Sequence, residues 1–119
     1  MDTRRIGSMY EDIACRYLTG KGYEIFERNY QNKLGEIDII AGSPEKILVY
    51  CEVKYRSSDE YGTPFEAVGY GKRRKICRAA SLHFAMHHYS DDTICRFDVI
   101  GIYGDGNIEH IENAFDMCR

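Results

Sequence analysis

The chain has 119 residues, of which 44% are hydrophobic and 29% charged, with a formal net charge of -3 at pH 7. This length suits one domain with a single two-layer core, so we treat residues 1–119 as one domain. No apolar run approaches the roughly 18 residues of a membrane span, and the first residues, MDTRRIGSMYED, lack the apolar segment of a secretory signal, so we expect a cytoplasmic protein with no membrane partner.

The first half of the chain predicts one helix and three strands. Apolar residues recur at helical spacing at Tyr10, Ile13, Ala14, Tyr17 and Leu18. The helix is expected to end at Gly20 or Gly22. Residues 23–30, 35–41 and 47–54 read as strands, and Gly42-Ser43-Pro44 joins the last two into a hairpin.

The second half predicts two helices and two strands. The sequence TPFE at residues 63–66 starts a short helix with a capping box, and a longer helix covers residues 72–88. The apolar face of the longer helix consists of Ile76, Ala79, Ala80, Phe84 and His87. Strands follow at residues 96–103 and 107–111. The order α-β-β-β-α-α-β-β predicts an α/β or α+β sheet with helices packed on it. Of the two we favour α/β, with a mixed central sheet flanked by helices.

Metal sites built from cysteine or histidine are not favoured. The five cysteines are an odd number and form no C-x-x-C pair, so we expect free thiols packed as small apolar side chains. His83 and His87 have the i, i+4 spacing of a metal pair, but no acid or cysteine accompanies them on that helix. Packing or surface roles are the expectation for both.

The hairpin places acidic residues where a sheet core is expected. A register centred near Glu45 puts Asp38 opposite Glu52, with Lys54 diagonally beside them. Strict alternation groups Ile37 with Ile39 and Ala41 on the other face. Opposed carboxylates repel each other, and water, the lysine or a divalent cation must offset that repulsion. Two carboxylates near a strand carbonyl suit Mg²⁺, which can activate water for attack on a phosphodiester. The alternative is a solvated polar face bridged by Lys54.

Several segments together resemble the PD-(D/E)xK nuclease superfamily, which has the restriction-endonuclease-like fold. They are YEDIACRYL, GYEIFERNY, GEIDIIA, CEVKYR, GTPFEAV, Lys72 at the start of KRRKICRAA, RFDVIGI and NAF. Within that superfamily the chain most resembles the YraN-like family of uncharacterised bacterial proteins. The resemblance implies a single restriction-endonuclease-like domain over residues 1–119. The superfamily's proline before the first acid is absent, since Ile37 precedes Asp38.

The resemblance also implies roles for individual residues. Asp38 and Glu52 match the two metal-binding acids, with the Val53 backbone carbonyl as a further ligand, and Lys54 matches the catalytic lysine. Glu11 matches an extra metal-site glutamate of archaeal-type Holliday junction resolvases. Ser8 and Glu11 also fit a capping box, so Glu11 has a second interpretation as a helix cap. Mg²⁺ or Mn²⁺ is the expected cofactor.

The remaining candidate residues lie around this site. Glu36 shares the Asp38 face and is either an outer acid of the site or a solvated residue, whereas Asp98, inside an apolar strand, is expected to be a structural hydrogen-bonding acid. A run of basic residues without an acid could contact the phosphate backbone, and with Arg56 it forms the candidate nucleic-acid surface: Lys72, Arg73, Arg74, Lys75 and Arg78. Solvated surface charge is the alternative for all of them.

The function expected from these features is metal-dependent hydrolysis of DNA phosphodiesters, with branched or single-stranded DNA as the favoured substrate. DNA is favoured over RNA, no small-molecule cofactor is expected, and a small domain that covers little DNA suggests a homodimer. Three alternatives stay open at this point. They are a non-catalytic nucleic-acid-binding module of a DNA-processing complex, a nuclease acting on RNA, and a structural protein with solvated hairpin acids.

Overall fold

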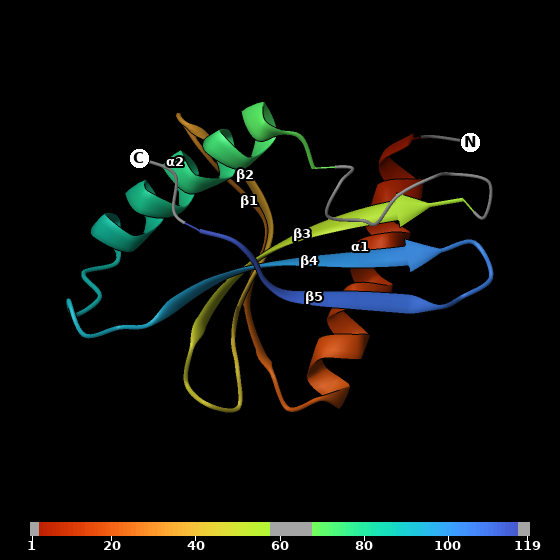
Figure 1. Cartoon of the computed structure of the whole chain (residues 1–119), viewed down its shortest axis with the longest axis horizontal. Coiled ribbons are helices and arrows are strands. Elements are labelled where there is room, and N and C mark those ends of the chain that lie inside the picture. The colour runs from red at the N-terminus through yellow and green to blue at the C-terminus, as the bar shows by residue number, and fades with distance from the viewer. Residues whose placement is uncertain (1–2, 58–67, 117–119) are drawn as a thin grey trace.

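The described part of the chain folds into two helices and five strands. The computed structural model describes residues 3–57 and 68–116. Within that part of the chain the elements are α1 (Thr3–Gly20), β1 (Glu24–Asn32), β2 (Gly35–Gly42), β3 (Leu48–Arg56), α2 (Tyr70–Met86), β4 (Cys95–Tyr103) and β5 (Ile108–Phe115) (Figure 1). The short helix expected at residues 63–66 lies outside the described residues.

The five strands form one mixed sheet in the spatial order β1-β2-β3-β4-β5. β3 and β4 are parallel and α2 connects them, whereas the other neighbours pair antiparallel. A parallel pair needs a crossover of this kind, because its second strand must start at the same edge as the first. The architecture is the predicted α/β fold, in which helices flank a mixed sheet.

The two helices cover opposite faces of the sheet (Figure 1). On the α1 side the core contains Leu18, Ile39 and Cys51, and on the α2 side it contains Tyr50 and Ile76 with their neighbours. β2 and β3 therefore have apolar contacts on both faces, which explains their nearly continuous apolar sequences. A carboxylate in the middle of either strand is removed from water. Its burial is unfavourable unless a hydrogen bond or an opposite charge compensates for the lost hydration.

The hairpin register agrees with the sequence prediction. Ile39 pairs with Cys51 and Ile40 with Tyr50, which is the register that puts Asp38 across from Glu52. The predicted face of Ile37 is wrong, because Ile37 packs in the core cluster on the α2 side while Ile39 packs on the α1 side. Strict alternation of side chains is lost at Asp38, the residue between them.

Three further details differ from the predictions. α1 begins at Thr3, well before the apolar stripe, and β5 extends to Phe115 because its C-terminal half pairs with β4 beyond a register shift. On α2 the buried histidine is His83, whereas His87 is exposed and caps the C-terminus of the helix. At the C-terminal end of α2 the buried face therefore contains His83 rather than the predicted His87.

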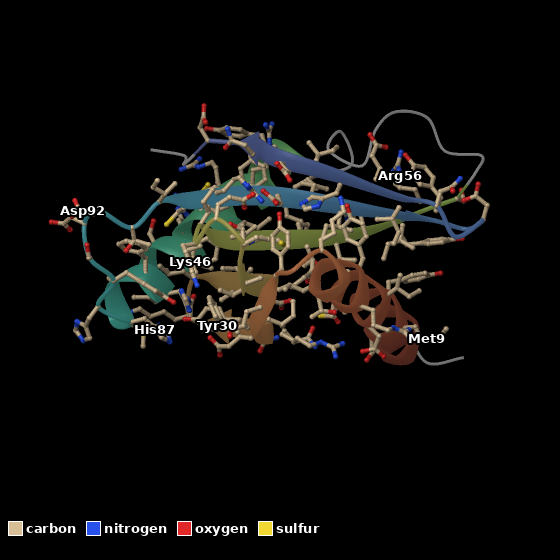
Figure 2. The ribbon with its side chains drawn as sticks, turned by 90° about the horizontal axis from the view of Figure 1, so that it is seen from below. Met9, Tyr30, Lys46, Arg56, His87 and Asp92 are labelled. Carbon is tan, nitrogen blue, oxygen red and sulfur yellow. The ribbon has the colours of Figure 1, made fainter. Side chains whose placement is uncertain are left out.

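The four described cysteines, Cys15, Cys51, Cys77 and Cys95, are free thiols, as expected. Neither described helix has the length and apolar character that crossing a bilayer requires. Figure 2 shows Met9 of α1 and Arg56 of β3 at one end of the molecule, and His87 and Asp92 at the other.

Candidate functional site

The hairpin acids meet where β2 parts from β3. The backbone ladder ends at Ile39 and Cys51, and beyond it the Val53 N–H donates to Asp38 Oδ2 at 2.8 Å. A side-chain acceptor replaces the β2 carbonyl there, which fixes the Asp38 carboxylate between the strands. Glu52, next to Asp38, has only 3% of its side chain exposed. Two carboxylates are therefore held together on rigid strands.

Glu11 of α1 brings a third carboxylate to the same region. Glu11, Asp38, Val53 and Lys54 line one cavity of about 410 Å³. Two of the predicted acids and the lysine thus come from three elements to one place, whereas Glu52 does not line this cavity and contacts Lys72 of α2. The contribution from α1 could not be read from the hairpin, since the helix lies far away in the sequence.

The structure excludes the helix-cap interpretation of Glu11. A capping box needs unpaired N–H groups at the first turn of a helix. α1 starts at Thr3, so Ser8 and Glu11 lie in its interior, where the backbone N–H groups already have helical partners. The cap was wrong because the polar first turns of α1 carry no apolar periodicity to reveal the true helix start.

Asn29 is a site residue that the sequence analysis missed. Its backbone has a positive φ of 52°, a conformation that asparagine tolerates better than most residues. In the amide orientation that satisfies both groups, its side-chain nitrogen donates to Glu11 at 2.9 Å from Oε2. Its position in the quoted segment GYEIFERNY gave no signal of this contact. Asn29 therefore holds the Glu11 carboxylate in place from β1.

Burial and crowding make these acids resist ionisation. The pKa of Glu52 is raised to about 7, chiefly by burial and then by the charge of Asp38, while Lys72 opposes the rise. The pKa of Glu11 is also raised, first by burial and next by Asp38, against the opposing effects of Arg28 and Asn29. Neighbouring acids that each resist the loss of a proton form a site that a cation stabilises.

Lys72 is part of this site. Its Nζ lies 2.6 Å from Glu52 Oε1, and about half of its side chain is exposed. Burial alone lowers the pKa of Lys72, but the hydrogen bond and charge of Glu52 outweigh it, so the net shift is upward. Lys72 was predicted to contact phosphate, and the structure shows that in this state it neutralises Glu52. A cation that used Glu52 as a ligand would compete with this ion pair.

The donor set fits a hard divalent cation. Carboxylate oxygens are the ligands that Mg²⁺ and Mn²⁺ prefer, and Mg²⁺ usually keeps several water ligands. The ligand atoms of Glu11, Asp38 and Glu52 do not all lie within 4.8 Å of one another. In residues 3–57 and 68–116, the trio of ligand atoms within 4.8 Å of one another is Glu27, His83 and His87 instead. Glu11, Asp38 and Glu52 therefore fit a cation that some of them reach through water.

The predicted nucleic-acid residues lie in three places: at a cavity, on the rest of α2, and at the end of β3. Lys72 and Lys75 line a cavity of about 730 Å³ together with Glu36, which lies beside Lys72 rather than in the Asp38 cavity. Arg74 and Arg78 are exposed on α2, and Arg73 packs near the Tyr70 ring. Arg56 pairs with Tyr103 at the end of β3, next to the cavity residue Tyr55, and lines neither cavity itself.

Asp98 has the structural role that its sequence context suggested. It is fully buried, accepts from Arg96 Nε at 2.8 Å and from the Asn113 N–H at 3.0 Å, and lies 2.7 Å from His110 Nε2. Burial would raise the pKa of Asp98, but these hydrogen bonds lower it overall. The network joins β4 to β5 on the side of the sheet that holds Tyr23.

A pair of tyrosines borders the acidic cavity. The rings of Tyr10 and Tyr55 stack with their centroids 4.6 Å apart, and both residues line the cavity with Asp38 and Lys54. Tyr55 remains 43% exposed. The sequence analysis found no base-stacking residue, because these two tyrosines are 45 positions apart and meet only through the packing of α1 on β3.

Comparisons with known proteins give a family and no activity. The model of the family described as "Uncharacterised protein family UPF0102" matches residues 10–102. A UPF0102 protein of Pelobacter propionicus is 45% identical over 98% of this chain and 86% of its own length. One of Clostridioides difficile is 42% identical over 97% of this chain and all of its own.

Among solved structures, SfsA of Pyrococcus furiosus, determined in complex with Ca²⁺, is similar at 15% identity with a TM-score of 0.33. That similarity covers 93% of this chain and 64% of the SfsA chain.

Proposed function

This chain belongs to the uncharacterised protein family UPF0102, and from its site we propose that it is a metal-dependent endonuclease. Its proposed reaction is hydrolysis of DNA phosphodiester bonds, with branched or single-stranded DNA as the substrate. The observation that carries this proposal is the acidic pair Asp38 and Glu52 on neighbouring strands, of which Asp38 lines one cavity with Lys54 and Glu11. Stability alone gives no reason to bury opposed carboxylates, because they repel each other.

Each residue has a distinct part in the proposed reaction. Asp38 and Glu52 would hold Mg²⁺ or Mn²⁺, with Glu11 and the Val53 carbonyl as further oxygen ligands. The metal supplies Lewis-acid polarisation of the scissile phosphate. The Lys54 ammonium donates hydrogen bonds to the attacking water or to the phosphate oxygens as negative charge accumulates on them. Asn29 keeps Glu11 oriented during this step.

The surface around the cavity supports a nucleic-acid substrate. α2 contains no acidic residue, and its exposed cations lie on the helix whose first turn carries Lys72 into the site. Cations at these positions neutralise phosphates without reading bases, which fits selection of DNA by structure rather than sequence. The stacked Tyr10 and Tyr55 offer an aromatic surface for an unpaired base beside the acids.

The Lys72–Glu52 ion pair favours a second candidate function. In this arrangement a lysine already neutralises the carboxylate that a metal needs, which suits a module that binds nucleic acid without cutting it. The nuclease proposal requires Lys72 to leave Glu52, and its half-exposed side chain has room to turn toward a phosphate. The two functions therefore differ in whether metal displaces Lys72.

The test is cleavage of labelled duplex, single-stranded, flap and four-way-junction DNA and of an RNA strand, each with Mg²⁺, Mn²⁺ or EDTA. Wild type is compared with Asp38→Asn and Lys54→Ala, and with the exposed control Arg16→Ala. Metal-dependent cleavage that the control keeps and both site variants lose supports the proposal. Binding without cleavage in every condition supports the non-catalytic module, and cleavage of RNA alone supports the RNA nuclease.

A further inference from the structure

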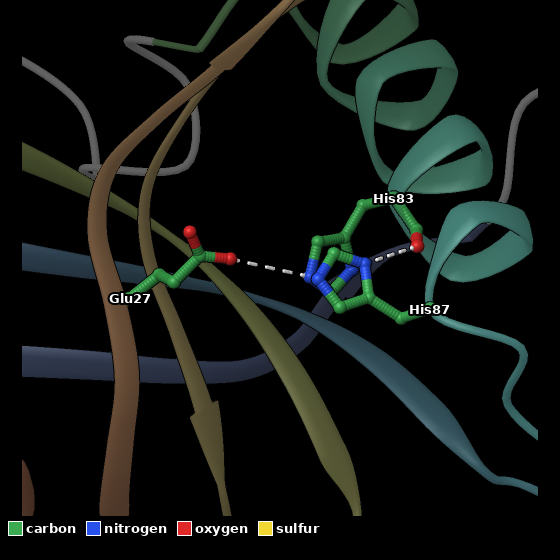
Figure 3. A group of neighbouring side chains, drawn as sticks. All are labelled: Glu27, His83 and His87. Carbon is green, nitrogen blue, oxygen red and sulfur yellow. Dashed lines mark hydrogen bonds and ion pairs between the residues drawn. The ribbon is translucent and has the colours of Figure 1, made fainter.

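A second cluster of metal-ligating side chains lies at the C-terminal end of α2. Glu27, His83 and His87 each offer a ligand atom, and these atoms lie within 4.8 Å of one another (Figure 3). The sequence placed His83 and His87 one turn apart but found no acid beside them. α2 itself carries no acid, as the sequence indicated, and the acid comes instead from β1, far away in the sequence.

A β-bulge explains how Glu27 reaches the histidines. The pairing of β1 with β2 shifts register between Ile25 and Glu27, so Phe26 is an extra residue. Without it Glu27 would share the face of Ile25, which packs in the core cluster on the α1 side. With it Glu27 turns to the α2 side, where its Oε2 lies 3.5 Å from His83 Nε2. Bulges commonly redirect a side chain in this way.

Both imidazoles are oriented by hydrogen bonds through their other nitrogen. His83 Nδ1 lies 2.9 Å from the Tyr50 hydroxyl, and His87 Nδ1 lies 2.9 Å from the His83 carbonyl oxygen. Since a carbonyl can only accept, His87 Nδ1 carries the proton and Nε2 has a free lone pair. Metal-binding histidines usually have such a partner on the second nitrogen, which fixes the tautomer and the ring plane.

We propose that Glu27, His83 and His87 bind one Zn²⁺ ion, separate from the acidic cavity. Two imidazole nitrogens and one carboxylate oxygen form a familiar zinc ligand set, with a fourth position for water. Ligand atoms about 2.1 Å from a tetrahedral ion lie about 3.4 Å apart, close to the 3.5 Å already present between His83 and Glu27. Nitrogen ligands disfavour Mg²⁺, which prefers oxygen.

The surroundings of the cluster support metal binding over a simple ion pair. Only 2% of the His83 side chain is exposed, whereas that of Glu27 is 43% exposed, so the site opens to solvent on the Glu27 side. The pKa of His83 is lowered by burial and then by neighbouring His87, against the opposing effect of Glu27. The two histidine rings lie with centroids 4.0 Å apart.

The site would tie the end of α2 to β1. Glu27 and His83 are more than fifty positions apart in the chain, so a bound ion closes a long loop and stabilises the folded chain. His87 lies at the end of the molecule opposite Met9, whereas the acidic cavity lies beside the α1 residues Gly7 and Tyr10 (Figure 2). Zinc binding can therefore be measured without reference to nuclease activity.

The experiment is titration of the EDTA-treated, dialysed full chain with ZnCl₂, followed by calorimetry and by thermal unfolding. We expect one equivalent of Zn²⁺ to bind and to raise the unfolding temperature. His87→Gln and Glu27→Gln should each weaken binding by more than about tenfold. The control His88→Asn, an exposed neighbour with φ 54°, should stay within about twofold of wild type.

Co²⁺ substitution and one further variant identify the ligands. The cobalt protein should show visible absorption of a nitrogen- and oxygen-ligated ion without a thiolate charge-transfer band. Asp38→Asn should leave zinc affinity unchanged. The proposal is overturned by the absence of zinc binding, by equal loss in His87→Gln and His88→Asn, by a thiolate band, or by loss of binding in Asp38→Asn.

Discussion

Replacement of Glu52 by glutamine is expected to make the metal-free protein more stable at alkaline pH. The pKa of this buried carboxyl is raised to about 7 from an ordinary value of 4.5, first by burial and then by Asp38. A difference of about 2.5 units corresponds to roughly 3 kcal/mol of unfavourable free energy when the group is ionised. Glutamine has a similar shape and no charge, so Glu52→Gln should recover most of that energy at pH 8.

The pH dependence of stability gives the direction of the effect. Between about pH 4.5 and pH 7 the folded state keeps a proton on Glu52 that the unfolded state has lost. The free energy of unfolding of wild type therefore falls as pH rises through this window and stays low above it. Glu52→Gln lacks this component, so the two proteins should differ little at pH 4.5 and most at pH 8.

The assay is urea unfolding with EDTA at pH 5 and pH 8, for wild type, Glu52→Gln and the exposed control Asp91→Asn. The burial argument is refuted if Glu52→Gln is less stable than wild type at pH 8. It is also refuted if the free energies of unfolding of the two proteins differ by the same amount at both pH values. Added Mg²⁺ should stabilise wild type and not Glu52→Gln. Equal stabilisation of both proteins by Mg²⁺ would refute Glu52 as a ligand.

Three other changes test the remaining parts of the structure. Asp98→Ala should lower the free energy of unfolding by about 3–5 kcal/mol in urea titrations, because it leaves a buried partner charge unpaired, and a loss below about 1 kcal/mol would contradict the network. Lys72→Met should shift the acidic limb of the cleavage pH profile upward, since Lys72 opposes the raised pKa of Glu52; an unchanged profile would show that the ion pair does not tune the site. Tyr55→Ala should weaken binding of single-stranded DNA about tenfold, because each stacked base contributes about 1–3 kcal/mol, and should leave duplex binding unchanged. Fluorescence anisotropy measures both affinities, and an equal loss for both kinds of DNA would refute base stacking.

Much of the candidate site could be predicted from local patterns. The hairpin register follows from the turn length between two apolar runs, so the opposition of Asp38 and Glu52 was visible in the sequence. The structural role of Asp98 was also predictable, because an acid inside an apolar strand needs buried partners. These features depend on residues close together in the chain and on the period of two of a strand.

Other features required contacts between distant segments. The helix-cap interpretation of Glu11 failed because polar residues at a helix start have no apolar periodicity, so the start was placed too late. The face of Ile37 was wrong because Asp38 interrupts the pairing of β2 with β3 and the alternation with it. Neither event has a signature in a single strand read alone.

The sequence by itself determined the order of elements, the hairpin and the acids on it, because periodicity and turn chemistry act over a few residues. The tertiary structure alone decided that Lys72 of α2 neutralises Glu52, that Asn29 holds Glu11, and that Glu27 meets His83. The last of these depends on one extra residue in β1, which turns Glu27 to the α2 side of the sheet. Packing between separate elements brings these groups together, and the energies that select it are spread over the whole core.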